Sequence, residues 1–190
     1  MPSLQLTVLG SGTSMGVPTL GCRCAVCESA DPRDNRTRPS VQMAYGGRNV
    51  VIDTTPDFRL QALRARMDHL DAVLYTHAHA DHILGLDDIR PFNLKQNRAV
   101  PLYGAPETLA ILRRQFGYIF DPGPVESTLP SVERSKATSA DSRVASIPGY
   151  SRIATIAAYC TGVRSKSAHS SMKIATAICC MRRIKCPGLV

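Results

Sequence analysis

The stretch "YTHAHADHILGLDDIR", residues 75–90, follows a short apolar run and places three histidines and one aspartate within six positions. The whole chain of 190 residues has only five histidines. Where a strand runs into a loop, alternate side chains can point the same way. His77 and His79 can then hold one metal ion, and Asp81 and His82 can hold a second ion about 3.5–4 Å away.

Two ions at this separation can share a bridging water and lower its pKa towards neutrality, which yields a hydroxide nucleophile. Asp81 is therefore named both as a ligand and as the candidate catalytic residue. The alternative is a surface turn whose histidines carry no chemistry. Four donors at this spacing directly after an apolar strand favour the metal site over that alternative.

A second cluster of metal-capable side chains lies in a long polar loop, residues 13–40. Cys22-x-Cys24-x2-Cys27 offers three thiols within six residues. A closed structural zinc site takes four ligands, so one is missing locally. The alternative is three reduced thiols without a metal. The N-terminus lacks the pattern of a secretion signal, so we expect a cytoplasmic protein rather than a disulfide framework.

The net charge of +8 is unevenly distributed along the chain. Residues 1–130 hold 13 basic and 13 acidic side chains, whereas residues 131–190 hold 10 basic and 2 acidic ones. Serine rises at the same place, from 6 in the first part to 10 in the second. We therefore divide the chain at residue 130 into a balanced N-terminal part and a basic, serine- and arginine-rich tail. No apolar run is long enough to predict a membrane span.

The hydrophobic pattern of the N-terminal part predicts strands followed by strand–helix alternation, an α/β protein with layered sheets. A hairpin should turn at Gly46–Gly47. A helix is expected over residues 56–70, with Phe58, Leu60, Leu63 and Met67 on one side. A helix after the histidines should be interrupted near Pro91. Further strands are expected at residues 4–9, 71–76 and 100–104, and a further helix at 106–120.

Four separate motifs occur in the order that a known family shows: "TVLGSGTSMGVPTLGCRCAVC", "NVVIDTTPDFR", "THAHADHILGLDDIR" and "VPLYGAPETL". Together they resemble metallo-β-lactamase-fold hydrolases, and among these the PhnP-like phosphodiesterase branch. The resemblance covers about residues 4–130. It implies a four-layer αββα sandwich, two catalytic divalent ions (Zn²⁺ or Mn²⁺), and hydrolysis of small phosphodiesters such as cyclic ribose phosphates.

The resemblance also implies residue roles. His77 and His79 would bind the first ion, and Asp81 and His82 the second. Asp53 would stand behind the metals and orient a ligand histidine; the alternative is a turn aspartate at a strand end.

Other family positions imply weaker roles. The cysteine cluster would hold a structural zinc, with a histidine from the C-terminal part as fourth ligand. The segment Asp87, Asp88 and Arg90 would touch substrate or metal, although a solvated helix face is the simpler interpretation. Substrate-binding residues are not assigned. The glycine-rich turn at residues 10–16 could cradle phosphate, but a tight turn of the fold suffices to explain it.

The family pattern stops near residue 131. A further histidine, a bridging aspartate and a last histidine are expected downstream, yet only His169 and Asp141 are available there, and Gly162 stands where an aspartate is expected. A frameshifted or degenerate tail is one hypothesis. It predicts a sandwich incomplete in its second half, low or no hydrolase activity, and marginal stability or homodimer formation.

Other classes of function stay open. The chain could be an inactive family remnant, a zinc-binding protein without activity, or a tRNA 3′-processing-type nuclease of the same fold. The tail has only Tyr150 and Tyr159 as aromatics, so nucleic-acid binding through stacked bases is not favoured. Neither a nucleic acid nor a membrane is expected as partner; a small phosphodiester is.

Overall fold

The computed structural model describes residues 3–122, 124 and 128–134. Its centre is a six-stranded sheet in which the strands lie in chain order, β1 to β6. The first three strands are antiparallel and the last four run parallel to one another. The strands are β1 (Gln5–Gly10), β2 (Ser40–Tyr45), β3 (Arg48–Ile52), β4 (Ala72–Leu74), β5 (Val100–Tyr103) and β6 (Val132–Arg134).

The β2–β3 hairpin turns at Gly46 and Gly47, as predicted. Both residues have positive φ, +56° and +75°. This conformation matches the twist of two antiparallel strands and is open to glycine without steric cost. The register pairs Tyr45 with Arg48 next to the turn. The hairpin therefore fixes which residues of β3 face which side of the sheet.

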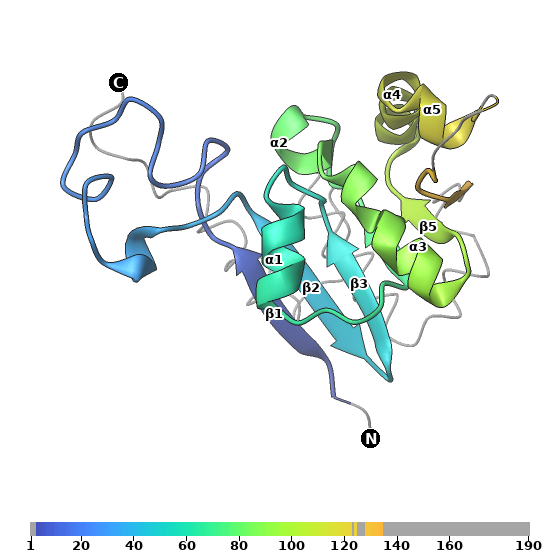
Figure 1. Ribbon diagram of the computed structural model, residues 1–190, viewed down its shortest axis with the longest axis horizontal. Coiled ribbons are helices and arrows are strands. Elements are labelled where there is room, and N and C mark those ends of the chain that lie inside the picture. Colours follow the sequence, from blue (N-terminus) through green and yellow to red (C-terminus); the bar gives the residue numbers. More distant parts are fainter. Residues whose placement is uncertain (1–2, 123, 125–127, 135–190) are drawn as a thin grey trace, which may run out of the picture.

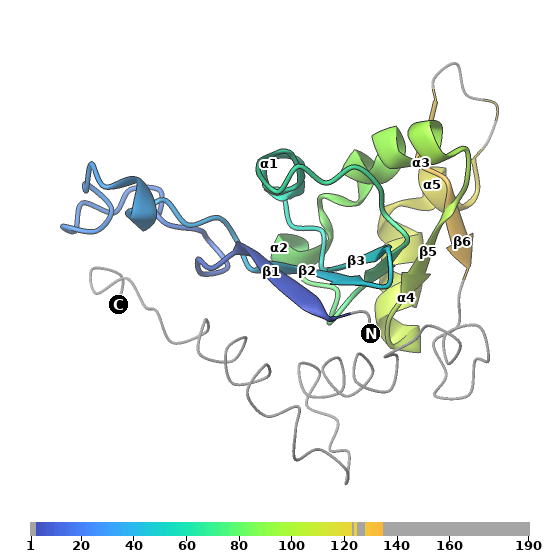
Figure 2. The same cartoon turned by 90° about the horizontal axis from the view of Figure 1, so that it is seen from below.

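Helices cover one face of the sheet, and α1 and α3 lie side by side on it (Figures 1 and 2). The main apolar core lies between them and the sheet and includes Phe58, Val51 and Val73. The opposite face carries a second cluster with Met43 and Ile52. The helices are η1 (Pro32–Asp34), α1 (Phe58–Arg64), α2 (Ala80–Ile83), η2 (Leu86–Ile89), α3 (Arg90–Gln96), α4 (Pro106–Gln115) and α5 (Gly117–Phe120).

The two apolar faces follow from the pattern of the central strands. Ala72 and Leu74 belong to the second cluster, whereas Val73 between them belongs to the main core. Successive side chains of a strand point to opposite faces, so a continuous apolar run predicts burial on both sides. A sheet that is apolar on both faces is the inner layer expected of a metallo-β-lactamase sandwich.

The predicted common side of α1 is wrong. Leu60 and Leu63 are 58% and 61% exposed, whereas Gln61 and Ala62 are buried with Phe58. Residues 58, 61 and 62 share a helix face at spacings of three and four, and position 60 lies on the other side. The helix also ends early, at Arg64, because Arg66 takes a left-handed conformation with φ +50°.

Pro91 begins a helix rather than interrupting one. It occupies the first turn of α3, where the missing N–H of proline costs no hydrogen bond. The residues before it form two short pieces, α2 and η2, joined at Gly85. A Cβ atom at Gly85 would lie 2.1 Å from the Thr55 carbonyl oxygen. The absence of a side chain therefore lets the turn after the histidines pack on the segment that follows β3.

β6 lies just beyond residue 130 and pairs in parallel with β5, Val100 opposite Val132. The periodicity of the sequence did not indicate this strand. No helix in the described part of the chain is long and apolar enough to cross a membrane.

We expect Gly85→Ala to lower the free energy of unfolding by about 1–3 kcal/mol, because the added methyl group must displace the Thr55 backbone. The measurement is a urea titration followed by far-UV circular dichroism. Gly117→Ala is the matched control, since a Cβ at Gly117 meets nothing within 4 Å. It should be neutral or stabilise by up to about 1 kcal/mol. Equal midpoints for the two variants would contradict the close packing at Gly85.

Candidate metal centre

The ends of two neighbouring parallel strands bring the acidic and histidine residues together. β3 ends at Ile52 and is followed by Asp53; β4 ends at Leu74 and is followed by Tyr75 and Thr76. The N–H of Asp53 donates to the Leu74 carbonyl oxygen at 2.9 Å, which ties the two strand ends together. Parallel strands place their carboxyl ends at one edge of a sheet, so the loop with the histidines begins beside Asp53.

Asp53 is buried, 3% exposed, and has a left-handed backbone with φ +61°. Such a conformation is uncommon outside glycine and persists only where surrounding contacts impose it. Here the Ser40 hydroxyl donates to the Asp53 carbonyl oxygen at 2.9 Å. The carboxylate accepts from the Thr76 N–H at 2.8 Å and from the Thr76 hydroxyl at 2.7 Å. It also contacts His82 Nδ1 at 2.7 Å.

Asp53 therefore contacts a histidine of the cluster directly, and its role in orienting a metal ligand stays a prediction. A carboxylate on one ring nitrogen of histidine fixes the orientation of the ring and makes the other nitrogen a better ligand. Because Nδ1 of His82 contacts Asp53, Nε2 is the atom that remains to face a metal ion. The metal-binding role of His82 itself stays a prediction.

The predicted ligands form two pairs of donor atoms. His77 Nε2 lies 3.1 Å from His79 Nδ1. His82 Nε2 lies 3.2 Å from Asp81 Oδ2. Two donors on one tetrahedral Zn²⁺, each about 2.0–2.1 Å from the ion, would be about 3.3 Å apart. The spacing within each pair thus fits one ion, and the pairing of ligands stays a prediction.

The two pairs are adjacent, with the rings of His77 and His82 4.0 Å apart between centroids. Within residues 3–122, 124 and 128–134, however, neither pair gains a third donor that closes a compact group. The histidines and bridging aspartate that the resemblance places downstream fall beyond these residues, as do His169 and Asp141. The described residues therefore supply two donors to each predicted ion.

The surroundings of His77 favour its uncharged form. Burial lowers the pKa of the His77 imidazole, and the neighbouring His82 lowers it further, although Asp53 opposes the change. Only the neutral imidazole offers a lone pair to a metal ion. Below the site, the phenol of Tyr75 is fully buried and shares a 2.6 Å hydrogen bond with the Thr54 hydroxyl. Burial raises the Tyr75 pKa, so this group is a neutral support of the loop.

The cysteine cluster occupies a separate place in the fold. The loop that carries it extends away from the sheet beyond the end of β1 (Figure 1, blue). The sulfur atoms of Cys22, Cys24 and Cys27 all lie within 4.8 Å of one another, and this is the one such group of three donors in the described residues. Sulfur atoms on one tetrahedral Zn²⁺ would be about 3.8 Å apart. The three thiols thus fit a shared ion, and the structural zinc stays a prediction.

The segment after the metal loop makes ordinary surface contacts. Asp87 accepts a hydrogen bond of 3.0 Å from the Tyr118 hydroxyl. Arg90 donates to the Thr128 carbonyl oxygen at 2.8 Å. Burial, with Asp87 nearby, raises the pKa of Asp88. These contacts connect α3 and its neighbours, and they agree with the simpler interpretation of this segment as helix surface with local partners.

The glycine-rich turn after β1 is built for close packing. Cβ atoms at Gly10 and Gly12 would lie 2.0 and 2.4 Å from carbonyl oxygens of Arg38 and Arg36. The N–H of Gly12 is bonded to the Thr37 carbonyl oxygen at 2.7 Å. That donor is therefore used within the fold, which favours the tight turn over a phosphate cradle.

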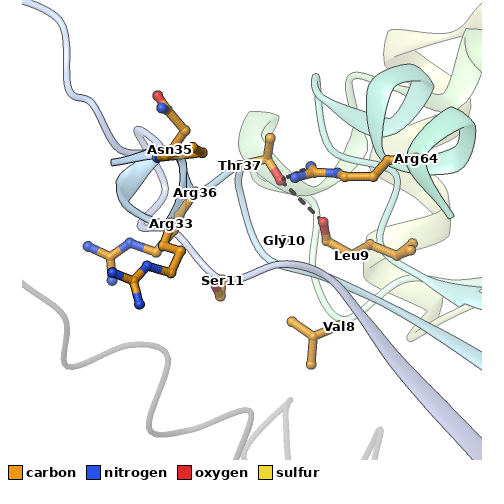
Figure 3. Close-up of a pocket in the computed structure, with 10 residues that line it drawn as sticks. Val8, Leu9, Gly10, Ser11, Arg33, Asn35, Arg36, Thr37 and Arg64 are labelled. Carbon is orange, nitrogen blue, oxygen red and sulfur yellow. Dashed lines mark hydrogen bonds between the residues drawn. The ribbon is translucent and has the colours of Figure 1, made fainter. Parts of the chain in front are cut away.

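A cavity of about 340 Å³ lies beside this turn (Figure 3). Arg33, Arg36 and Arg64 contribute to its wall. The wall is formed entirely within residues 8–64 and includes none of the predicted metal ligands. Arg64 donates to the Thr37 hydroxyl at 3.4 Å (Figure 3), and Arg33 is paired with Asp31. The contacts of Arg64 and Arg33 thus lie beside the cysteine loop, apart from the histidine cluster.

One functional candidate was not predicted from the sequence. Thr76 contacts both Asp53 and the ring of His77, at 2.7 and 3.0 Å from its hydroxyl oxygen. The available signal was its place in "YTHAH", directly before the first histidine. Its contact with Asp53 depends on the alignment of β3 and β4, which the local sequence does not show.

Comparison with known proteins places these features in a family. The family described as "Beta-lactamase superfamily domain" matches residues 48–171. The crystal structure of a diphosphatase from the PhnP family is 52% identical, with a TM-score of 0.63, over 72% of this chain and 51% of that one. Zn²⁺-bound PqqB from Methylobacterium extorquens is 27% identical, with a TM-score of 0.54, over 72% of this chain and 46% of that one.

Curated relatives give the same region of similarity. An octanoyltransferase of Porphyromonas gingivalis is 44% identical over 126 residues, which are 66% of this chain and 25% of that protein. Coenzyme PQQ synthesis protein B of Methylorubrum extorquens is 31% identical over 121 residues, 56% of this chain and 39% of that protein. The chain thus spans well under half the length of these two relatives.

Loss of a residue that supports a metal ligand lowers metal affinity about 10–100-fold. We expect His79→Ala, which removes a predicted ligand itself, to weaken divalent-metal binding at the histidine cluster by more than this. The measurement is a competition titration of the metal-free full chain against a chromophoric chelator. His69→Ala is the matched control, because His69 lies before β4 and contacts Asp68, at the far end of the strand from the cluster. Equal loss of affinity in both variants would contradict the assignment.

Proposed function

Because the chain belongs to the metallo-β-lactamase superfamily, whose members include hydrolases, we propose that it hydrolyses small phosphodiesters with the help of two divalent ions. The observation that carries this proposal is the pair of donor sets, His77 with His79 and Asp81 with His82, at spacings that suit one ion each. The PhnP-family diphosphatase at 52% identity supports a phosphorus–oxygen bond as the target.

When bound, two such ions lower the pKa of water and neutralise charge on phosphate oxygens. The side chains that would bind these ions lie close together. His77 Nε2 and His79 Nδ1, 3.1 Å apart, would hold one ion, and Asp81 with His82 Nε2 would hold the next. Burial lowers the pKa of the His77 imidazole, which favours the neutral form that a metal ion binds. Asp53 holds the ring of His82 and is itself held by two strand ends.

The proposed substrate class includes phosphodiesters and diphosphates, since both are cleaved by attack of water on phosphorus. The likeness to the octanoyltransferase covers a quarter of that protein, so acyl transfer is not taken over from its name. A tRNA 3′-processing activity is the less favoured alternative within the fold, because the cysteine cluster is shared with the PhnP-like branch. We propose a cytoplasmic protein without membrane or nucleic-acid partners.

A second candidate function is zinc binding without catalysis. The observation that favours it is that the three cysteines form the most complete donor group in the described residues, whereas each histidine pair has two donors. In this case the chain would be a structural remnant of the family, stapled by one Zn²⁺. The two candidates differ in whether the histidine cluster turns over a substrate.

We expect the full chain to hydrolyse a bis-aryl phosphodiester slowly, and only with added Mn²⁺ or Zn²⁺, because the described residues supply two donors to each ion. A diphosphate ester serves as the second substrate. His79→Ala should abolish turnover, and His69→Ala should leave it unchanged. Metal binding without turnover of either substrate would favour the remnant. Turnover that survives in His79→Ala, or that needs no metal, would contradict the proposed site.

We expect Cys24→Ser to lower the zinc content by one ion per chain, since serine replaces a thiolate ligand with a weaker one. Replacement by Co²⁺ separates the two kinds of site, because cobalt–thiolate bonds give a near-ultraviolet charge-transfer band and cobalt–imidazole bonds do not. The band should fall in Cys24→Ser and persist in His79→Ala. If the Co²⁺-loaded wild-type chain lacks this band, the prediction of a structural zinc site at the cysteines is wrong.

A further inference from the structure

The Asp53 network, which comprises Asp53, Thr76, His77 and His82, joins both predicted metal positions through one carboxylate. Oδ2 of Asp53 lies 2.7 Å from the Thr76 hydroxyl and 2.7 Å from His82 Nδ1. The same Thr76 hydroxyl lies 3.0 Å from His77 Nδ1. One carboxylate oxygen thus reaches a ring of the first ligand pair through threonine, and a ring of the second pair directly.

The proton positions in this network follow from counting donors. A threonine hydroxyl has one proton to donate and two lone pairs that accept. A carboxylate accepts only, so the Thr76 proton points to Asp53. The hydroxyl must then accept from its other neighbour, which makes His77 Nδ1 a donor. His82 Nδ1 faces the same carboxylate and is a donor for the same reason.

We infer that Asp53 and Thr76 together set His77 and His82 in the Nδ1–H form before any metal binds, so that Nε2 of each ring presents a lone pair to its ion. Thr76 is thus a positioning residue, and it acts through His77. This inference deepens the proposed function and rests on it for its purpose, although the proton arrangement itself exists without metal or substrate.

The metal-facing nitrogens of both rings lie beside their predicted partner ligands. Nε2 of His77 points to His79 Nδ1, its predicted partner on the first ion. Nε2 of His82 lies 3.2 Å from Asp81 Oδ2, its predicted partner on the second. Neutral imidazole in water prefers the Nε2–H form, which would block both positions. The network therefore holds both rings in the less common form, which a ligand through Nε2 requires.

Burial strengthens the constraint. Thr76 is 7% exposed and Asp53 is 3% exposed, so water does not compete freely for their hydrogen bonds. The Thr76 N–H also donates to Oδ1 of Asp53 at 2.8 Å. Thr76 thus donates a hydrogen bond to each oxygen of the Asp53 carboxylate. These two bonds fix the Thr76 hydroxyl within reach of His77. A valine at this position would keep the backbone bond and the shape but lose the hydroxyl.

The test is the two-bond nitrogen–proton NMR spectrum of the imidazole rings in the ¹⁵N-labelled, metal-free full chain at mildly alkaline pH. His77→Gln and His82→Gln assign the two rings. We expect both rings of the wild type in the Nδ1–H form. Thr76→Val should move His77 towards the Nε2–H form and leave His82 unchanged, whereas Thr76→Ser should restore His77. Thr54→Val is the matched control, because Thr54 is a buried threonine whose hydroxyl contacts Tyr75.

Metal titration gives a second measurement on the same proteins. Thr76→Val should weaken binding of the first ion about 10-fold, as loss of a ligand's supporting partner does. A wild-type His77 in the Nε2–H form, or a His77 unchanged by Thr76→Val, would overturn the inference whether or not the chain binds metal. If the NMR result is as expected but no metal binds, the network stands and the proposed function fails. The wild-type spectrum decides the point even if Thr76→Val does not fold.

Discussion

The carboxylate of Asp53 is the contact on which the site depends. It sits at the joint between β3 and β4, where its backbone N–H binds the Leu74 carbonyl oxygen and its side chain binds Thr76 and His82. The residue takes a left-handed backbone conformation that needs outside support, which Ser40 provides from β2. Three neighbouring strands thus cooperate to hold one acidic group behind the histidine loop.

The rest of the fold serves to keep that joint rigid. Apolar residues on both faces of the central strands bury the sheet between two clusters, so the strand ends have little freedom. Gly85 allows the turn after α2 to approach the Thr55 carbonyl oxygen closely. His82 lies on α2, just before this turn, and its ring contacts Asp53. The His82 ring and the Asp53 carboxylate therefore meet through a short, packed segment of the chain.

Much of this arrangement could be predicted from the sequence. The His77-x-His79-x-Asp81-His82 pattern and the strand before it are local features, so the sequence indicates that these donors lie together; their pairing on two ions stays a prediction. The Gly46–Gly47 turn is local in the same sense. The prediction that Phe58, Leu60 and Leu63 share one side of α1 was wrong, because Leu60 and Leu63 are apolar yet exposed. The inner positions are Gln61 and Ala62, and only the packing of the helix on the sheet shows this. Thr76 and the backbone of Asp53 depend on contacts between strands far apart in the sequence, which a single sequence does not encode locally.

The central claim is that the Asp53 network fixes which nitrogen of each ring meets a metal. Crystals of the full chain grown with Zn²⁺, measured by anomalous diffraction at the zinc edge, test it most directly. The account predicts one peak at bonding distance from Nε2 of His77 and Nδ1 of His79, and a second at bonding distance from Nε2 of His82 and from Asp81. Zinc bound through Nδ1 of His77 or His82, or anomalous density confined to the cysteine loop, would contradict it.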